Sequence, residues 1–160
     1  MNDRAPMFDV VSHEVLLSYD GLAFLKALIE GKLPPPPIFE TIGFNLAEAE
    51  HGRTVFEGVP QFRHYNPIGS VHAGFAATLL DSAVYCAIHS TLGKGEIATT
   101  LEIKINLVRE LTKDTGNVRA EGRVIHRGRS TATSDGTLRD GTGRLYAHAS
   151  TTCMILQARR

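Results

Sequence analysis

The sequence predicts an α+β domain in which an antiparallel β-sheet wraps around one long buried helix. Residues 69–91 are rich in Ala and Leu and contain one formally charged residue, Asp81, and a helix that is apolar nearly all round is a buried helix. The chain that follows alternates apolar and polar residues between turn signals, which is typical of antiparallel strands.

The composition excludes several classes of protein. The 160 residues suit one domain, and Lys plus Arg and Asp plus Glu number 17 each. This zero balance argues against a nucleic-acid or anionic-membrane partner, because both need a basic surplus. Cys86 and Cys153 form no disulfide or metal pattern. No signal peptide or long apolar span is evident, so we expect a cytoplasmic protein.

The region before the sheet predicts one short helix. Residues 1–18 carry few structural signals, and we expect a flexible arm. Asp20 can cap a helix over about 21–31, whose leucines recur at helical spacing and which Gly31 ends. Pro34–Pro37 predict a stiff extended connector.

Six strands follow from the patterns around the central helix. His51-Gly52 and Asp140-Gly141 are turn signals, the second of them strong. Leu101 lies on the apolar face of its predicted strand. The strands are expected at 38–50, 53–62, 101–107, 118–124, 130–139 and 145–155. The chain therefore divides into two parts: an arm, helix and connector over residues 1–37, and a domain of sheet and helix over residues 38–157.

Asp81 requires an explanation within an uncharged helix. A carboxylate buried there must be paired, hydrogen-bonded or protonated, because burying it bare costs several kcal/mol. Two interpretations stay open: a residue that faces solvent or an arginine across an interface, and a perturbed carboxylate in a functional cleft.

The segment before the helix can stabilise a developing negative charge. Asn66, Pro67 and Gly69 predict a turn that leads to the helix N-terminus, where unpaired N–H groups lie at the positive end of the dipole. The small residues Ala73 and Gly74 let a ligand approach this backbone, so a carbonyl placed there would have its oxyanion stabilised.

One chain cannot bring Asp81 and the Ala73 amide to the same carbonyl. Asp81 lies over two helical turns further on, about 12–14 Å along the axis at 1.5 Å per residue. Two antiparallel helices side by side in a two-fold dimer would place Asp81 of one chain opposite the Ala73 amide of the other.

Other catalytic patterns are absent from the sequence. It has no GxSxG motif, no HExxH motif and no cluster with metal-ligand spacing, so we expect no metal. His72 is either a helix cap or a catalytic group, and His89 near the helix end suits the dipole as a cation. The other histidines show no sign of a catalytic role: His13, His51, His64, His126 and His148.

The segment from Asn66 to Asp81 resembles the signature of the phenylacetate-degradation (PaaI-like) branch of hot-dog-fold acyl-CoA thioesterases. That signature has an Asn, a His-Gly-Gly six residues later and an Asp nine residues after the His, which is the spacing of Asn66, His72 and Asp81. The similarity covers residues 38–156. Ala73 stands where the family usually has Gly, and its backbone N–H is retained.

The resemblance implies a hot-dog fold and hydrolysis of acyl-CoA, with coenzyme A as part of the substrate and no separate cofactor. It implies a homodimer whose sheets join edge to edge, often a dimer of dimers. Asp81 would act as nucleophile or general base, and the Ala73 N–H would polarise the thioester carbonyl. Asn66 would position water or the leaving thiolate, and His72 would support the loop and Asn66. Gly74 is counted with these catalytic residues.

The resemblance also implies residues outside the helix. Thr100 stands where the family often has a Ser or Thr that assists the attacking water, with Thr99 one residue away. Arg127, Gly128, Arg129 and Ser130 form a turn that can clamp the phosphates of coenzyme A. The alternative for this turn is a solvated hairpin tip.

Two further functions stay open for the same fold. One is an acyl-CoA-binding or regulatory module that does not hydrolyse its ligand, because fold does not determine function. The other is an enoyl-thioester hydratase or dehydratase, which pairs a His with a carboxylate. Four residues of the helix either shape an acyl pocket or belong to the core: Phe75, Leu79, Tyr85 and Ile88.

Overall fold

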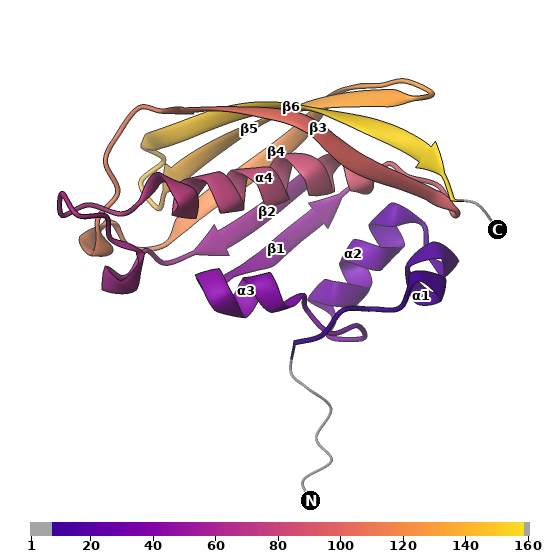
Figure 1. Ribbon diagram of the computed structural model, residues 1–160, viewed down its shortest axis with the longest axis horizontal. Coiled ribbons are helices and arrows are strands. Elements are labelled where there is room, and N and C mark those ends of the chain that lie inside the picture. Colours follow the sequence, from indigo (N-terminus) through magenta and orange to yellow (C-terminus); the bar gives the residue numbers. More distant parts are fainter. Residues whose placement is uncertain (1–7, 159–160) are drawn as a thin grey trace, which may run out of the picture.

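A computed structural model describes residues 8–158. A six-stranded antiparallel sheet with the order β1-β2-β4-β5-β6-β3 curls around the long helix α4, Ala73–His89 (Figure 1). This arrangement confirms the predicted fold class. The strands are β1 Phe44–Glu50, β2 Arg53–Gly58, β3 Glu96–Leu107, β4 Val118–Arg127, β5 Thr131–Asp140 and β6 Leu145–Gln157.

Contacts between backbone and small side chains set the depth at which α4 lies on the sheet. Thr54 and Gly122 are opposite each other on β2 and β4, and the Thr54 hydroxyl donates to the Ala83 carbonyl at 2.8 Å. A Cβ at Gly122 would come within 2.2 Å of the same oxygen. The Ser134 hydroxyl on β5 donates to the Val84 carbonyl at 2.7 Å. These contacts bring the helix backbone against the strands.

The opposite face of α4 is open, which corrects the prediction of a helix buried all round. Leu79, Leu80 and Val84 are buried toward the sheet, whereas Ala73 and Asp81 are exposed. The sheet covers one side of the helix only, so the carboxylate does not enter the core.

The predicted turns at His51-Gly52 and Asp140-Gly141 are both confirmed. Strand β3 contains an irregularity that the apolar–polar alternation of its sequence does not reveal. Thr100 pairs with Cys153 and Glu102 pairs with Thr152, so Leu101 is an extra residue in a β-bulge. The extra residue shifts, by one position, the alternation of side chains between the two faces of the strand. Leu101 is therefore 55% exposed and does not share the helix-facing side of the strand.

The N-terminal region contains three helices where the sequence predicted one. Helix α2, Gly21–Ile29, is confirmed, and its Asp20 cap accepts from the Ala23 N–H at 2.8 Å. Helix α1, His13–Ser18, lies within the segment that the sequence predicted as a flexible arm. The Ser12 side chain caps its first turn and so fixes where this helix begins. Residues 1–7 of that arm lie outside the described residues.

Helix α3, Pro37–Ile42, replaces the expected beginning of the first strand. Pro37 occupies the first helical position, which suits its restricted φ and missing N–H, and Gly43 at φ 77° ends the helix in the left-handed region. The first strand therefore begins at Phe44 and not at residue 38. Pro34 to Pro36 form the extended connector.

The helices before residue 43 pack on the same core as the sheet. Leu25 of α2 is buried in the cluster that contains Phe44, Phe56 and Leu79. The Gly21 N–H donates to the Leu92 carbonyl at 2.9 Å, which ties α2 to the segment after α4. Residues 8–43 therefore form one wall of the molecule (Figure 1). The boundary at residue 37 stays a prediction.

Within residues 8–158, no helix is both long and apolar enough to cross a membrane. The same residues contain no group of three or more His, Cys, Asp or Glu side chains that could hold a metal ion.

We predict that Gly122→Ala lowers the free energy of unfolding by about 1–3 kcal/mol, the usual effect of overpacking, because the new methyl group would meet the backbone of α4. Urea unfolding measures this change. Gly141→Ala is the control, because a Cβ there meets nothing within 4 Å, and it should change stability by less than about 0.5 kcal/mol. Equal stability of the two variants would contradict the close contact.

Candidate active site

Two cavities adjoin α4. The first has a volume of about 500 Å³ and includes Asp81 in its wall. The second has a volume of about 450 Å³ and includes Asn66, His72 and Ala73. Four of the predicted catalytic residues are therefore divided between two cavities at opposite ends of the same helix, whereas Gly74 and Thr100 line neither of them.

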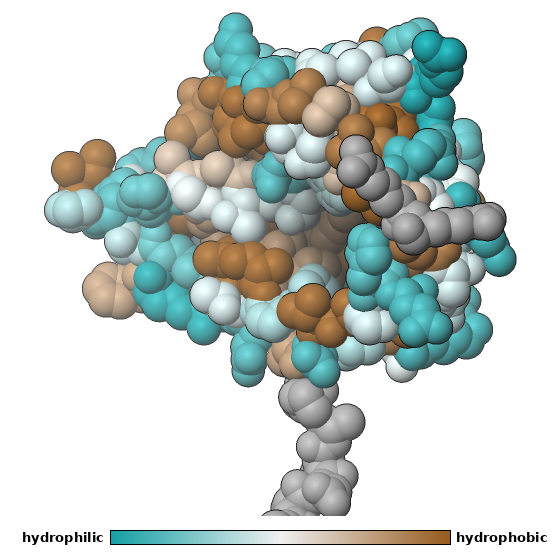
Figure 2. All heavy atoms as spheres, turned by 45° about the vertical axis from the view of Figure 1, so that its right-hand side comes forward, coloured by the Kyte–Doolittle hydropathy of each residue, from teal (hydrophilic) through white to brown (hydrophobic). Residues whose placement is uncertain are grey.

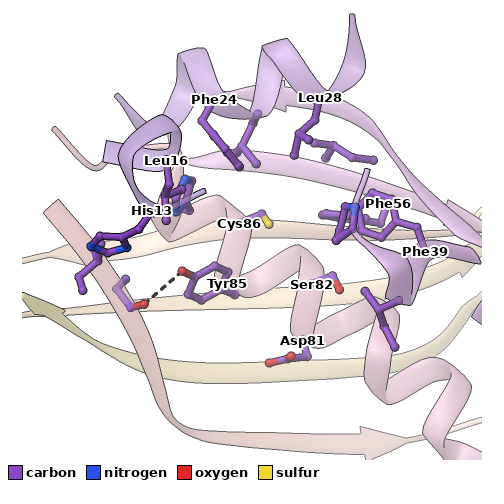
Figure 3. A pocket seen from close by; sticks show the side chains of 17 residues that line it. His13, Leu16, Phe24, Leu28, Phe39, Phe56, Asp81, Ser82, Tyr85 and Cys86 are labelled. Atoms are coloured by element: carbon purple, nitrogen blue, oxygen red, sulfur yellow. Dashed lines mark hydrogen bonds between the residues drawn. The ribbon is translucent and has the colours of Figure 1, made fainter. Parts of the chain in front are cut away.

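The first cavity is mainly apolar. Its wall comes from the helices α1, α2 and α3, from the strands β1 and β2, and from α4 and the start of β3 (Figure 3). Large side chains dominate it: Leu16, Phe24, Leu28, Phe39, Phe56 and Tyr85. Figure 2 shows a hollow on this side of the molecule, with apolar residues around it. This cavity suits the hydrophobic part of a ligand.

Asp81 projects from α4 at the border of this cavity (Figure 3). No hydrogen-bond donor or cation among the described residues contacts its carboxylate. Although the side chain is exposed at the open face, neighbouring protein atoms remove part of its hydration, which raises its pKa above the usual value. Among the described residues it is therefore not half of an ion pair.

The N-terminus of α4 offers a free backbone donor. His72 is the N-cap, and its Nδ1 accepts from the Gly74 N–H at 2.8 Å. The first N–H groups of a helix have no acceptor within the helix, and the Ala73 N–H has no other acceptor among the described residues. His72 is thus a helix cap, and it leaves the Ala73 N–H free at the exposed surface.

Asn66 shapes the loop before the helix. Its Oδ1 accepts from the Ile68 N–H at 3.0 Å and from the Ser70 N–H at 3.2 Å, and its Nδ2 donates to the Ser70 hydroxyl at 3.0 Å. Gly69 has a φ of 91°, a region that glycine adopts without strain. One N–H of the Asn66 amide remains for a ligand in the second cavity.

Thr100 and Thr99 face opposite sides of β3. Thr100 is opposite the buried Cys153, and its hydroxyl lies 3.8 Å from the Cys153 sulfur, so it is on the helix side of the sheet. Thr99 is exposed on the other side. Of the two candidates, Thr100 has the orientation that a role beside α4 requires.

The turn from Arg127 to Ser130 is partly occupied by internal contacts. Arg127 donates to Glu96 at 2.6 Å and to the Gly128 carbonyl at 2.8 Å. Arg129 is exposed and has no ion-pair partner among the described residues. Arg127 therefore holds the turn, and Arg129 is the cation that remains available to a phosphate.

Within residues 8–158, strand β3 is an edge of the sheet and pairs only with β6. It lies beside the open face of α4, because the Tyr85 hydroxyl donates to the Ala98 carbonyl at 3.1 Å. The edge also carries exposed apolar residues, Leu101, Leu107 and Val108. A long unpaired edge of this kind is a template for pairing with another chain.

The sequence missed most of the wall of the first cavity. Of the four helix residues that could line a pocket or the core, Tyr85 lines the cavity, and Phe75, Leu79 and Ile88 are buried in the core. The wall residues of the N-terminal helices carry no motif. His89 also lines the cavity, and burial lowers its pKa to about 4, so the prediction of a cation at the helix end is wrong.

The comparison with known proteins shows the family. The family model of the Thioesterase superfamily matches residues 68–147, half of the chain. A 1,4-dihydroxy-2-naphthoyl-CoA hydrolase of Listeria monocytogenes is 27% identical over 121 residues, which are 76% of this chain and 97% of the relative.

Solved structures show the same fold. A phenylacetic acid degradation-related protein of Ralstonia eutropha has a TM-score of 0.74 and 26% identity, over 82% of this chain and 98% of that one. A Streptococcus mutans protein bound to acetyl-CoA has a TM-score of 0.65 and 26% identity, over 73% and 91%. The PaaI protein of Escherichia coli has a TM-score of 0.74 and 20% identity, over 89% and 97%. The chain belongs to the Thioesterase superfamily and has its hot-dog fold.

Proposed function

We propose that the protein hydrolyses acyl-CoA thioesters at a site that two chains build together. The observation that carries this proposal is the division of the catalytic groups. Asp81, without a partner among the described residues, borders one cavity, and the free Ala73 N–H lies in another, about 12 Å away along the helix at 1.5 Å per residue. Neither cavity alone contains a complete hydrolytic site.

A two-fold dimer would complete the site. Ala73, Ala77 and Asp81 recur every four residues and so form one stripe on the open face of α4. The midpoint of this stripe is Ala77, whose small side chain allows a second helix to approach. With a two-fold axis near Ala77, Asp81 of each chain would face the partner subunit's Ala73. Pairing of the exposed β3 edges would join the two sheets.

The chemistry follows from this juxtaposition. The Ala73 N–H would donate to the thioester carbonyl and stabilise the oxyanion. Asp81 would either remove a proton from the attacking water or attack the carbonyl carbon itself. In the first case the C–S bond then breaks to give the free acid, and in the second it breaks to give a mixed anhydride on Asp81 that water hydrolyses to the free acid. In both cases coenzyme A leaves as a thiolate that takes up a proton. Asn66 would position the water or the thiolate, and Thr100 would assist the water.

The two ends of the substrate would contact different parts of the protein. The acyl group would enter the apolar cavity beside Asp81, whose large aliphatic and aromatic side chains suit it. The exposed Arg129 would meet a phosphate of coenzyme A, with Arg127 and Gly128 holding the turn and Ser130 beside them. The relative named as a CoA hydrolase and the neighbour bound to acetyl-CoA support a ligand of this class.

Replacement of Ala73 by proline tests the backbone donor. Proline removes the N–H, yet it is favoured at the first position of a helix. The residue before it, His72, already has the extended φ and ψ of −59° and 138° that a following proline requires. We expect kcat to fall by about 10²–10³-fold, as for the loss of one oxyanion donor, in a thiol-release assay.

The fold should be unchanged in this variant, which circular dichroism and the melting temperature will check. Ala73→Gly, which keeps the N–H, should retain most of the activity. If Ala73→Pro hydrolyses acyl-CoA as fast as the wild type, the oxyanion role of this amide is wrong.

Asp81→Asn tests the carboxylate and its pH dependence. We expect kcat/KM to fall by about 10²–10⁴-fold, the usual contribution of a general base. Only the ionised carboxylate is active, and burial raises its pKa above the ordinary 3.8. The wild-type kcat/KM should therefore fall as the pH is lowered through that raised pKa, because protonation removes the base.

The residual activity of Asp81→Asn should lack this acidic limb. A pH profile with the same acidic limb in both proteins would show that another group titrates. Tight binding of acyl-CoA without thiol release by the wild type would instead support a binding module.

A further inference from the structure

One wall of the acyl cavity is attached to the rest of the protein by few contacts. His13 and Leu16 of α1 line the cavity, yet α1 contains no buried residue. Among the described residues, one hydrogen bond ties residues 8–19 to the rest of the chain: the Asp9 N–H donates to the Pro35 carbonyl at 3.1 Å. No ion pair among those residues involves this segment. We call residues 8–19 the strap.

The neighbouring walls are anchored firmly. Leu25 of α2 is 2% exposed, and the ring centroid of Phe39 on α3 lies 4.8 Å from that of Phe44. At Gly21, just after the strap, a Cβ would come within 1.7 Å of the His89 carbonyl oxygen, so the start of α2 lies directly against the end of α4. Segments with few buried contacts open at a low free energy. The strap is therefore the wall that moves most easily.

The strap lies at the end of the cavity that is distant from Asp81. The ring centroid of Tyr19 is 6.3 Å from that of Phe24, which in turn is 5.5 Å from that of His89. His89 follows Asp81 by eight residues of α4, about 12 Å along the axis at 1.5 Å per residue. Figure 3 shows His13 of the strap at this end, away from Asp81.

The apolar space continues beneath the strap. A smaller cavity of about 150 Å³ lies between Val10 and Val11 of the strap and the surface below them. Phe24, Leu28 and Pro36 line both this cavity and the acyl cavity. A ligand chain that passes the end of the first cavity would therefore meet further apolar side chains if the strap moved away.

The length of an acyl group decides whether it reaches the strap. An extended chain covers about 1.2 Å for each bond, because the peptide backbone covers about 3.3–3.6 Å for three bonds. Along this path an octyl chain spans about 8 Å and a hexadecyl chain about 18 Å. With its sulfur beside Asp81, the octyl chain would end before His89, and the hexadecyl chain would extend about 6 Å beyond it.

We propose that long acyl chains displace the strap, so that the substrates of this site include acyl groups longer than the enclosed cavity. This inference rests on the proposed function, because it places the thioester beside Asp81. Displacement removes few contacts of the strap. The additional methylene groups bury apolar surface on Phe24 and Leu28 in its place, which stabilises the complex.

Binding of uncleavable thioethers tests the proposal independently of hydrolysis. The Kd values of S-octyl-CoA and S-hexadecyl-CoA are measured on the full-length wild-type protein by titration calorimetry, below the concentration at which the longer probe forms micelles. We expect the hexadecyl probe to bind at least as tightly as the octyl probe. A fixed end wall would instead exclude the longer chain and raise its Kd above that of the octyl probe.

A single tryptophan shows whether the strap moves, because the chain contains none. Leu16→Trp places the reporter on the strap, and Phe39→Trp is the matched control on the anchored α3, since both positions line the acyl cavity. Indole emission shifts to longer wavelength when water surrounds the ring and to shorter wavelength in apolar surroundings. We expect the hexadecyl probe to shift Leu16→Trp to longer and Phe39→Trp to shorter wavelength. The octyl probe should shift neither variant to longer wavelength.

Weaker binding of the hexadecyl probe than of the octyl probe would overturn the proposal, as would emission from Leu16→Trp that does not move to longer wavelength. If Leu16→Trp does not fold, Tyr19→Trp keeps an aromatic ring beside Phe24 and should give the same shift. Binding of neither probe would contradict both this inference and acyl-CoA as the ligand. Binding of both probes without thiol release from any acyl-CoA would contradict the proposed hydrolysis alone.

Discussion

The close contact between α4 and the strands at Gly122 determines how the central helix is placed on the sheet. A side chain at this position would meet the Ala83 carbonyl, and the hydroxyls of Thr54 and Ser134 bind the same turn of the helix. Together they fix both the depth and the rotation of α4. The opposite stripe, with Ala73 and Asp81, must then face away from the sheet. The placement of the candidate catalytic groups is thus a consequence of packing on the other side of the helix.

The two ends of α4 have different chemical characters. Its N-terminus is exposed and presents the free Ala73 N–H, while its C-terminus is buried and presents the unpaired imidazole of His89. The helices α2 and α3 cover the space between Asp81 and His89 and turn an open groove into a cavity. In this account, the hot-dog sheet and helix supply the reacting groups, and the N-terminal helices supply the pocket that selects the acyl chain.

The sequence predicted those features that follow from local periodicity. The single charge within residues 69–91 indicated the central helix, and the alternation over 118–124 and 145–155 indicated two strands that the structure confirms. The spacing from Asn66 to Asp81 indicated the family. Each of these signals lies within one continuous segment, where side-chain periodicity reports burial directly.

Features that depend on contacts between distant segments could not be predicted in this way. The bulge at Leu101 leaves no mark on the apolar–polar alternation, because its effect appears only in the pairing with β6. The helix at Pro37–Ile42 looked like the start of a strand, since its short apolar run fits either structure. His89 seemed a cation at a helix end, and only the packing of Phe24 against it shows that it is buried and neutral.

In the proposed dimer, each active site combines Asp81 of one chain with the Ala73 amide of another. Co-expression of Asp81→Asn and Ala73→Pro chains with different affinity tags, followed by isolation of the mixed dimer, tests it most directly. In a shared arrangement, one of the two sites in the mixed dimer combines an intact Asp81 with an intact Ala73 N–H, so about half of the wild-type kcat should return although both parent variants are inactive. A mixed dimer as inactive as its parents would show that both groups act within one chain and would contradict the account.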